Sequence, residues 1–76
     1  MTNYTITFYQ ASGTDRIERS TFNRNYSSLS CAKRFATRNN QYDMAVITIN
    51  HKGIDVDITD KYRDEKWSKV LDLDTI

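Results

Sequence analysis

The sequence predicts an α+β fold in which a small antiparallel β-sheet of four or five strands carries one α-helix packed on one face. Apolar and polar residues alternate along residues 3–10 and 54–59, as is typical of strands with one covered face. Residues 29–40 instead repeat apolar side chains at the spacing of an amphipathic helix. At 76 residues, the chain is expected to form a single domain that spans 1–76.

Length and composition favour a binding or inhibitor module over an enzyme. A chain of 76 residues has little material with which to enclose a water-free catalytic pocket. The sequence contains no apolar run near the ~18 residues that a membrane helix needs, so no membrane partner is expected. Cys31 is the single cysteine, which leaves no partner for an internal disulfide or a zinc site. We therefore expect a reducing cytoplasm, no metal and no cofactor.

The first strand is predicted over residues 3–10, with Tyr4, Ile6 and Phe8 on one face. The sequence ASGTD at 11–15 is expected to turn the chain. Residues 16–22 have a weaker pattern. They form either a second strand of a hairpin, with Ile17 facing inward, or a loop.

The helix is predicted to begin after Ser28, with Ser27 as the competing N-cap, because a serine hydroxyl can accept hydrogen bonds from free amides of the first turn. It should end near Asn39 or Asn40, since asparagine tolerates the left-handed conformation that closes many helices. Residues 39–43 then form a connection. The apolar side of this helix consists of Leu29, Ala32, Phe35 and Ala36.

The apolar run at 44–50 predicts a central strand, and Gly53 can supply the positive φ of the turn that follows. Residues 60–66 are polar and turn-like. Residues 66–74 are predicted as a last strand that carries Trp67 over the core, with a short helix as the competing interpretation. Within 54–59, the alternation places Asp55, Asp57 and Thr59 outward. The predicted inner face of the sheet consists of Ile6, Phe8, Ala45, Ile47, Ile54, Val56 and Ile58.

Few residues have the pattern of a catalytic site. His51 is the only histidine and is expected to be an exposed turn residue beside Lys52. Asp55 and Asp57 share a strand face, where solvation is their expected role. Cys31 lies near the helix N-terminus and near cations that could lower its pKa, but a half-buried packing role is favoured.

Charge is distributed unevenly along the chain. Residues 1–42 carry six cations and two acids, whereas residues 43–76 carry five cations and eight acids. No Asp or Glu occurs between Glu18 and Asp43, although a merely solvated helix normally mixes both signs. The polar helix face is therefore a candidate surface for phosphate or carboxylate groups. Its predicted partner-binding residues are Lys33, Arg34, Thr37, Arg38, Asn40 and Gln41.

The segment SLSCAKRFATR, Ser28 to Arg38, resembles the helix of a family of small phage anti-CRISPR proteins that act on type I-F CRISPR surveillance complexes. The family motif looks like Ser-Leu-Ser-x-Ala-Lys-Arg-x-Ala-Ser-Lys. Lys33 and Arg34 match it, Arg38 stands where the family has lysine, and Asn40 replaces a glutamine with a shorter amide. The likeness covers about the last fifty residues.

The resemblance implies one helix packed on an antiparallel sheet and binding to the backbone subunits of the crRNA-guided complex, where target DNA would otherwise lie. The expected protein is then a monomeric phage inhibitor that acts in the host bacterial cytoplasm. The family pattern does not account for the cations near the N-terminus, which are Arg16, Arg19 and Arg24.

A small nucleic-acid-binding protein that uses the same basic helix face is the alternative. The acidic C-terminal half opposes general affinity for DNA, and no glycine–aromatic stacking motif is present. Binding to DNA without a protein partner, with a steep loss of affinity as salt is added, would favour this alternative.

Overall fold

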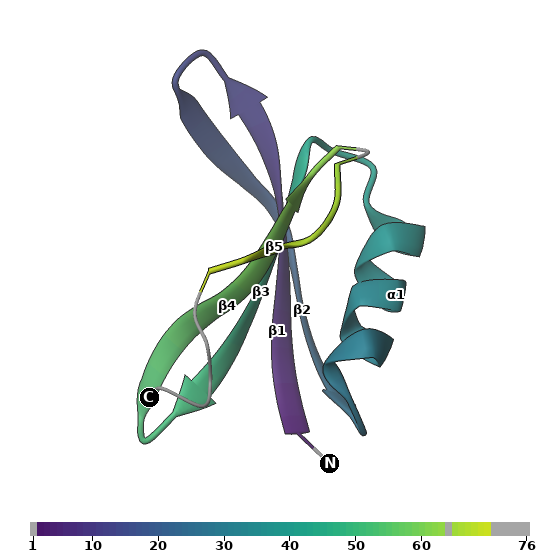
Figure 1. Cartoon of the computed structure of the whole chain (residues 1–76). Helices are drawn as coiled ribbons and strands as arrows, with labels where there is room; N and C mark the ends of the chain where they lie inside the picture. The colour runs from purple at the N-terminus through teal and green to yellow at the C-terminus, as the bar shows by residue number, and fades with distance from the viewer. Residues whose placement is uncertain (1, 64, 71–76) are drawn as a thin grey trace.

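A five-stranded antiparallel sheet with one helix beside it forms the part of the chain that the computed structural model describes, residues 2–63 and 65–70 (Figure 1). The strands lie in the order β2-β1-β3-β4-β5. This arrangement confirms the predicted α+β fold. The elements are β1 (Thr2–Ser12), β2 (Asp15–Tyr26), α1 (Leu29–Asn39), β3 (Met44–His51), β4 (Ile54–Tyr62) and β5 (Ser68–Lys69).

Residues 16–22, for which the sequence allowed a strand or a loop, form part of a strand. β2 pairs with β1 from Thr2↔Tyr26 to Ser12↔Asp15. Ile17 pairs with Gln10, two residues beyond the core residue Phe8, but it is 46% exposed and does not join the core. β1 pairs with β3 only as far as Tyr9, so the outer part of the β1–β2 hairpin extends beyond β3. Figure 1 shows this arm leaning away from α1, so the helix does not cover the outer part of the hairpin.

Both predicted helix ends are close to those observed, but the capping interactions differ. The Ser28 side chain makes no capping hydrogen bond with the backbone. Its hydroxyl instead donates to the Cys31 sulfur at 3.5 Å. At the other end Asn40 is extended rather than left-handed, with φ −74° and ψ 111°. Its backbone N–H donates to the Ala36 carbonyl, while the Asn39 side chain donates to the Phe35 carbonyl.

The β3–β4 hairpin turns at Lys52 and Gly53, which both have positive φ as a two-residue hairpin turn requires. The register shifts between Ile47 and Thr48, so that Ile47 faces Thr59 while Thr48 faces Asp57. This bulge breaks the strict alternation predicted for residues 54–59. Thr59, predicted to point outward, is therefore buried, and its hydroxyl donates to the Ser68 carbonyl.

The core lies between the sheet and α1, which contacts β1, β2 and β3. Ile54 does not belong to it, contrary to the prediction, because it is 65% exposed beside the turn at the end of the sheet. Val56, Leu29, Phe35 and Trp67 are partly buried and pack against the core. The buried core residues are Tyr4, Ile6, Phe8, Ala32, Ala36, Ala45, Ile47, Ile49 and Ile58.

The segment after β4 is only partly the strand that was predicted for residues 66–74. β4 itself continues to Tyr62, so the first residues of the expected turn at 60–66 are strand. β5 covers Ser68–Lys69, and residues 71–74 lie outside the described residues. Among the described residues, no helix is long and apolar enough to cross a membrane.

Candidate functional site

The three helix cations, Lys33, Arg34 and Arg38, do not form one cluster. At about 100° per residue, Lys33 and Arg38 point about 140° apart around the helix axis. Arg34 and Arg38 are exposed, whereas Lys33 is half-buried. The polar face is therefore divided between the β4 side of the helix and the β2 side.

Lys33 leans towards the C-terminal segment. Its ammonium nitrogen lies 6.0 Å from the centroid of the Trp67 ring, within the range of a cation–π interaction. Because Trp67 itself packs against the core, this contact connects α1 to the segment that precedes β5. Lys33 thus has a structural partner, which the sequence pattern did not indicate.

Arg34 and Arg38 line a shallow groove of about 340 Å³ on the β2 side of α1. We call it the arginine groove. Arg24 of β2 adds a further cation nearby, with its guanidinium 5.6 Å from the centroid of the Phe35 ring. Neither helix arginine forms an ion pair with any residue that the structure describes. The residues that line the arginine groove are Tyr26, Cys31, Arg34, Phe35, Arg38 and Asn39.

Thr37 and Asn40 line a different depression, of about 310 Å³, between α1 and the end of β4. We call it the Trp67 pocket. Gln41, the last predicted site residue, is exposed and lines neither the pocket nor the groove. The side chains that line the Trp67 pocket belong to Ala36, Thr37, Asn40, Tyr42, Asp43, Ala45, Lys61, Arg63 and Trp67.

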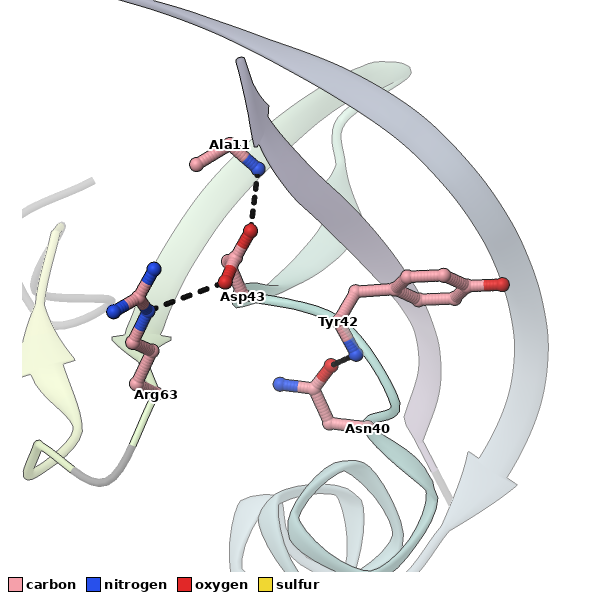
Figure 2. Close-up of polar contacts among 5 residues, drawn as sticks. All are labelled: Ala11, Asn40, Tyr42, Asp43 and Arg63. Atoms are coloured by element: carbon pink, nitrogen blue, oxygen red, sulfur yellow. Dashed lines mark hydrogen bonds and ion pairs between the residues drawn. The ribbon is translucent and has the colours of Figure 1, made fainter. Parts of the chain in front are cut away.

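A polar network fixes one wall of the Trp67 pocket (Figure 2). Asp43 accepts from the Ala11 backbone N–H through Oδ2 at 2.7 Å and from Arg63 Nε through Oδ1 at 3.2 Å. Asn40 Oδ1 accepts from the Tyr42 backbone N–H at 2.9 Å. These bonds hold the connection between α1 and β3 against β1 and the end of β4.

Cys31 is half-buried and free of any disulfide, in keeping with the favoured packing role. Hydrogen bonds with the hydroxyl groups of Ser28 and then Ser27 lower the pKa of the Cys31 thiol, and the charge of Arg34 acts in the same direction. The structure describes no base beside it within hydrogen-bond distance.

The histidine and the two aspartates that the sequence singled out lie in the β3–β4 hairpin. No group of three His, Cys, Asp or Glu among residues 2–63 and 65–70 is placed to hold a metal ion. Asp55 and Asp57 are exposed and accept hydrogen bonds from Asn50 and Thr48 on β3. His51 is not the exposed turn residue that was expected. It ends β3 half-buried, and its Nε2 has no hydrogen-bond partner in the described structure.

Sequence reasoning missed three residues of the site, Lys61, Arg63 and Trp67, because they were placed in a polar turn and in a core-capping strand. Only the pairing of β3 with β4, in which Ala45 faces Lys61, brings this segment beside α1. Comparisons of the chain with protein-family models, with curated proteins and with solved structures found no match.

Proposed function

We propose that the protein is a phage-encoded inhibitor that binds the backbone subunits of a type I-F crRNA-guided surveillance complex and blocks hybridisation of target DNA. The observation that carries the proposal is the exposed pair Arg34 and Arg38, which has no ion-pair partner among the described residues. The resemblance of Ser28–Arg38 to anti-CRISPR helices supports the identity of the partner.

The physical basis is a preorganised cationic surface. The two arginines project from a helix whose opposite side is anchored by Ala32 and Ala36, both fully buried. Little backbone order has to be created when a partner binds, and a guanidinium forms bidentate bonds with carboxylate or phosphate groups. The crRNA held by the backbone subunits presents phosphate groups of this kind, so the helix would occupy the surface that target DNA would otherwise use.

In this proposal the inhibitor is a monomer, needs no cofactor and acts in the host bacterial cytoplasm. It performs no chemistry. Its effect depends only on occupancy of the surface that DNA would use.

The test is a binding assay of the full chain on a purified, immobilised type I-F complex, followed by competition with target DNA. We expect Arg34→Glu and Arg38→Glu each to weaken binding by about 30-fold or more, since losing one desolvated charged contact typically costs about 2–5 kcal/mol. Lys52→Glu is the matched control, because this cation lies on the β3–β4 turn and lines neither the arginine groove nor the Trp67 pocket. Full affinity in the Arg34→Glu, Arg38→Glu double variant would refute the proposal.

The arginine groove also supports a second candidate, direct binding of nucleic acid. Two aromatic residues, Tyr26 and Phe35, line it together with Arg34 and Arg38. Aromatic rings can stack on bases while cations contact phosphates. Gel-shift assays with DNA and RNA in the absence of any protein distinguish the two. Tight binding that falls steeply with salt would favour this candidate over the inhibitor.

A further inference from the structure

The Trp67 pocket is lined on two sides by hydrogen-bond donors. The α1 wall supplies the Thr37 hydroxyl and the Asn40 amide, and the β4 wall supplies the Lys61 ammonium and the Arg63 guanidinium. Lys61 is half-buried, and its side chain forms no ion pair or hydrogen bond with another described residue. An ammonium group without an internal partner, beside further donors, attracts an anion.

Asp43, the one carboxylate among the described lining residues, is already bound within the protein. Each oxygen of Asp43 accepts a hydrogen bond, one from the Ala11 backbone and one from Arg63 Nε. The ion pair uses only the Nε of Arg63, and Figure 2 shows its two terminal nitrogens pointing away from Asp43. Among the described lining residues, the pocket therefore carries two cations and one internally satisfied acid, and the terminal nitrogens of Arg63 form no hydrogen bond with them.

The orientation of the Asn40 amide follows from its neighbour. The Tyr42 backbone N–H needs an acceptor, so the amide oxygen faces it at 2.9 Å. The NH₂ group must then point the other way, and Figure 2 shows it on the side of Arg63. Asn40 thus contributes a donor to the pocket, although an asparagine side chain also contains an acceptor.

We infer that the Trp67 pocket binds a phosphate group. Donors on two opposite walls suit the tetrahedral oxygens of phosphate better than the planar oxygens of a carboxylate, which are normally met from one side. We assign this phosphate to the sugar–phosphate backbone of the nucleic acid in the bound complex. This assignment rests on the proposed function. The pocket would then position the inhibitor while the arginines contact the protein.

The first test needs only the isolated protein, because Trp67 is its single tryptophan and lines the pocket. Trp67 fluorescence and ¹H–¹⁵N spectra are recorded during titration with inorganic phosphate, and separately with acetate, at constant ionic strength. We expect a saturable response to phosphate that includes the Asn40 side-chain NH₂ resonance. A response no stronger than that to acetate would overturn the assignment and indicate a carboxylate site instead.

Asn40→Asp tests the contribution of the Asn40 donor to phosphate binding most directly. It keeps an oxygen for the Tyr42 N–H but replaces the donor in the pocket with a negative charge. We expect it to weaken phosphate binding at least about tenfold. Gln41→Glu makes the same amide-to-carboxylate change one residue later, outside the pocket, and should bind phosphate as the unmodified chain does. Lys61→Gln supplies a second variant if Asn40→Asp lowers the melting temperature. Unchanged phosphate affinity in both pocket variants would refute the inference.

The same variants separate this inference from the proposed function. If the isolated protein binds phosphate but Asn40→Asp retains full affinity for the type I-F complex, the pocket is real and its assignment to that complex is wrong. If only Arg34→Glu and Arg38→Glu weaken binding to the complex and phosphate never binds, the proposed function stands and the pocket inference fails.

Discussion

Asp43 and Arg63 are joined twice, once through their side chains and once through their backbones. Arg63 Nε donates to Asp43 Oδ1 at 3.2 Å, and the Arg63 backbone N–H donates to the Asp43 carbonyl at 2.7 Å. The second carboxylate oxygen of Asp43 holds the Ala11 N–H. Asp43, the residue immediately before β3, thus holds the end of β4 and the outer part of β1 in place. These bonds fix one wall of the Trp67 pocket.

The two residues should nevertheless contribute unequally to stability. Asp43→Ala removes two hydrogen bonds, from the exposed Ala11 N–H and from Arg63 Nε, and is expected to cost about 1–3 kcal/mol because each contributes about 0.5–1.5 kcal/mol. Arg63→Ala removes an ion pair whose arginine side chain is 62% exposed and an exposed contact with the Tyr62 ring at 5.1 Å, so it should cost about 1 kcal/mol or less. Chemical denaturation of both variants measures the difference. Equal losses would mean that the bond to Ala11 contributes nothing.

The different burial of two isoleucines in the β3–β4 hairpin predicts a contrast in stability. Ile47 is fully buried on β3, and Ile47→Ala should cost about 2–5 kcal/mol, enough to unfold much of so small a domain. Ile54 is 65% exposed, so the same substitution there should change stability by about 0.5 kcal/mol at most. Urea midpoints of the two variants test this. A large loss in Ile54→Ala would place that side chain in the core, as the alternation in the sequence suggested.

The lowered pKa of Cys31 predicts a pH dependence of alkylation. The serine hydroxyl groups favour the thiolate, so the rate of reaction with iodoacetamide should rise at lower pH in the folded chain than in urea. Ser28→Ala should move that rise to higher pH, whereas Ser30→Ala should not. Because the folded pKa is depressed, the stabilisation is complete above the unfolded pKa and is lost as pH falls through the folded one. Identical profiles in the folded and unfolded chains would contradict this.

The fold was predictable where one pattern dominated its segment. Residues 44–50 are apolar almost throughout and form the central strand, and the helical spacing of Ala32 and Ala36 places both in the core. β2 was left open between strand and loop because its burial comes almost entirely from Phe22 and Tyr26, while most of its side chains are exposed. A strand that is held mainly by backbone pairing to its neighbour has little hydrophobic pattern to read.

The candidate site was predictable only in part. The sequence indicated the cations on α1, since local spacing places them opposite the apolar side chains. It could not indicate Lys61 and Arg63, which join Asn40 only through the register of β3 with β4. Nor could it show that Lys33 lies over Trp67, a contact between residues 34 positions apart. Long-range contacts of this kind depend on how the elements pack.

Lys33 should therefore behave differently from the two helix arginines when its charge is reversed. Its half-buried side chain lies over the Trp67 ring, so Lys33→Glu removes a cation–π contact worth about 0.5–1 kcal/mol. It also places a carboxylate against the negative face of the ring. Arg38→Glu changes an exposed side chain without a partner among the described residues and should leave stability within about 0.5 kcal/mol. Thermal melts of the two variants, with Trp67 emission recorded in each, measure the contrast.

Lys33→Met separates the two contributions of this side chain, because it keeps much of the apolar stem and removes only the charge. We expect its melting temperature to lie between those of the unmodified chain and Lys33→Glu. Trp67 emission should shift in both Lys33 variants and stay unchanged in Arg38→Glu. If Lys33→Glu melts and fluoresces as Arg38→Glu does, Lys33 is free of Trp67 in solution. It would then join the arginines as part of one outward cationic surface, and reversal of its charge should affect only partner binding.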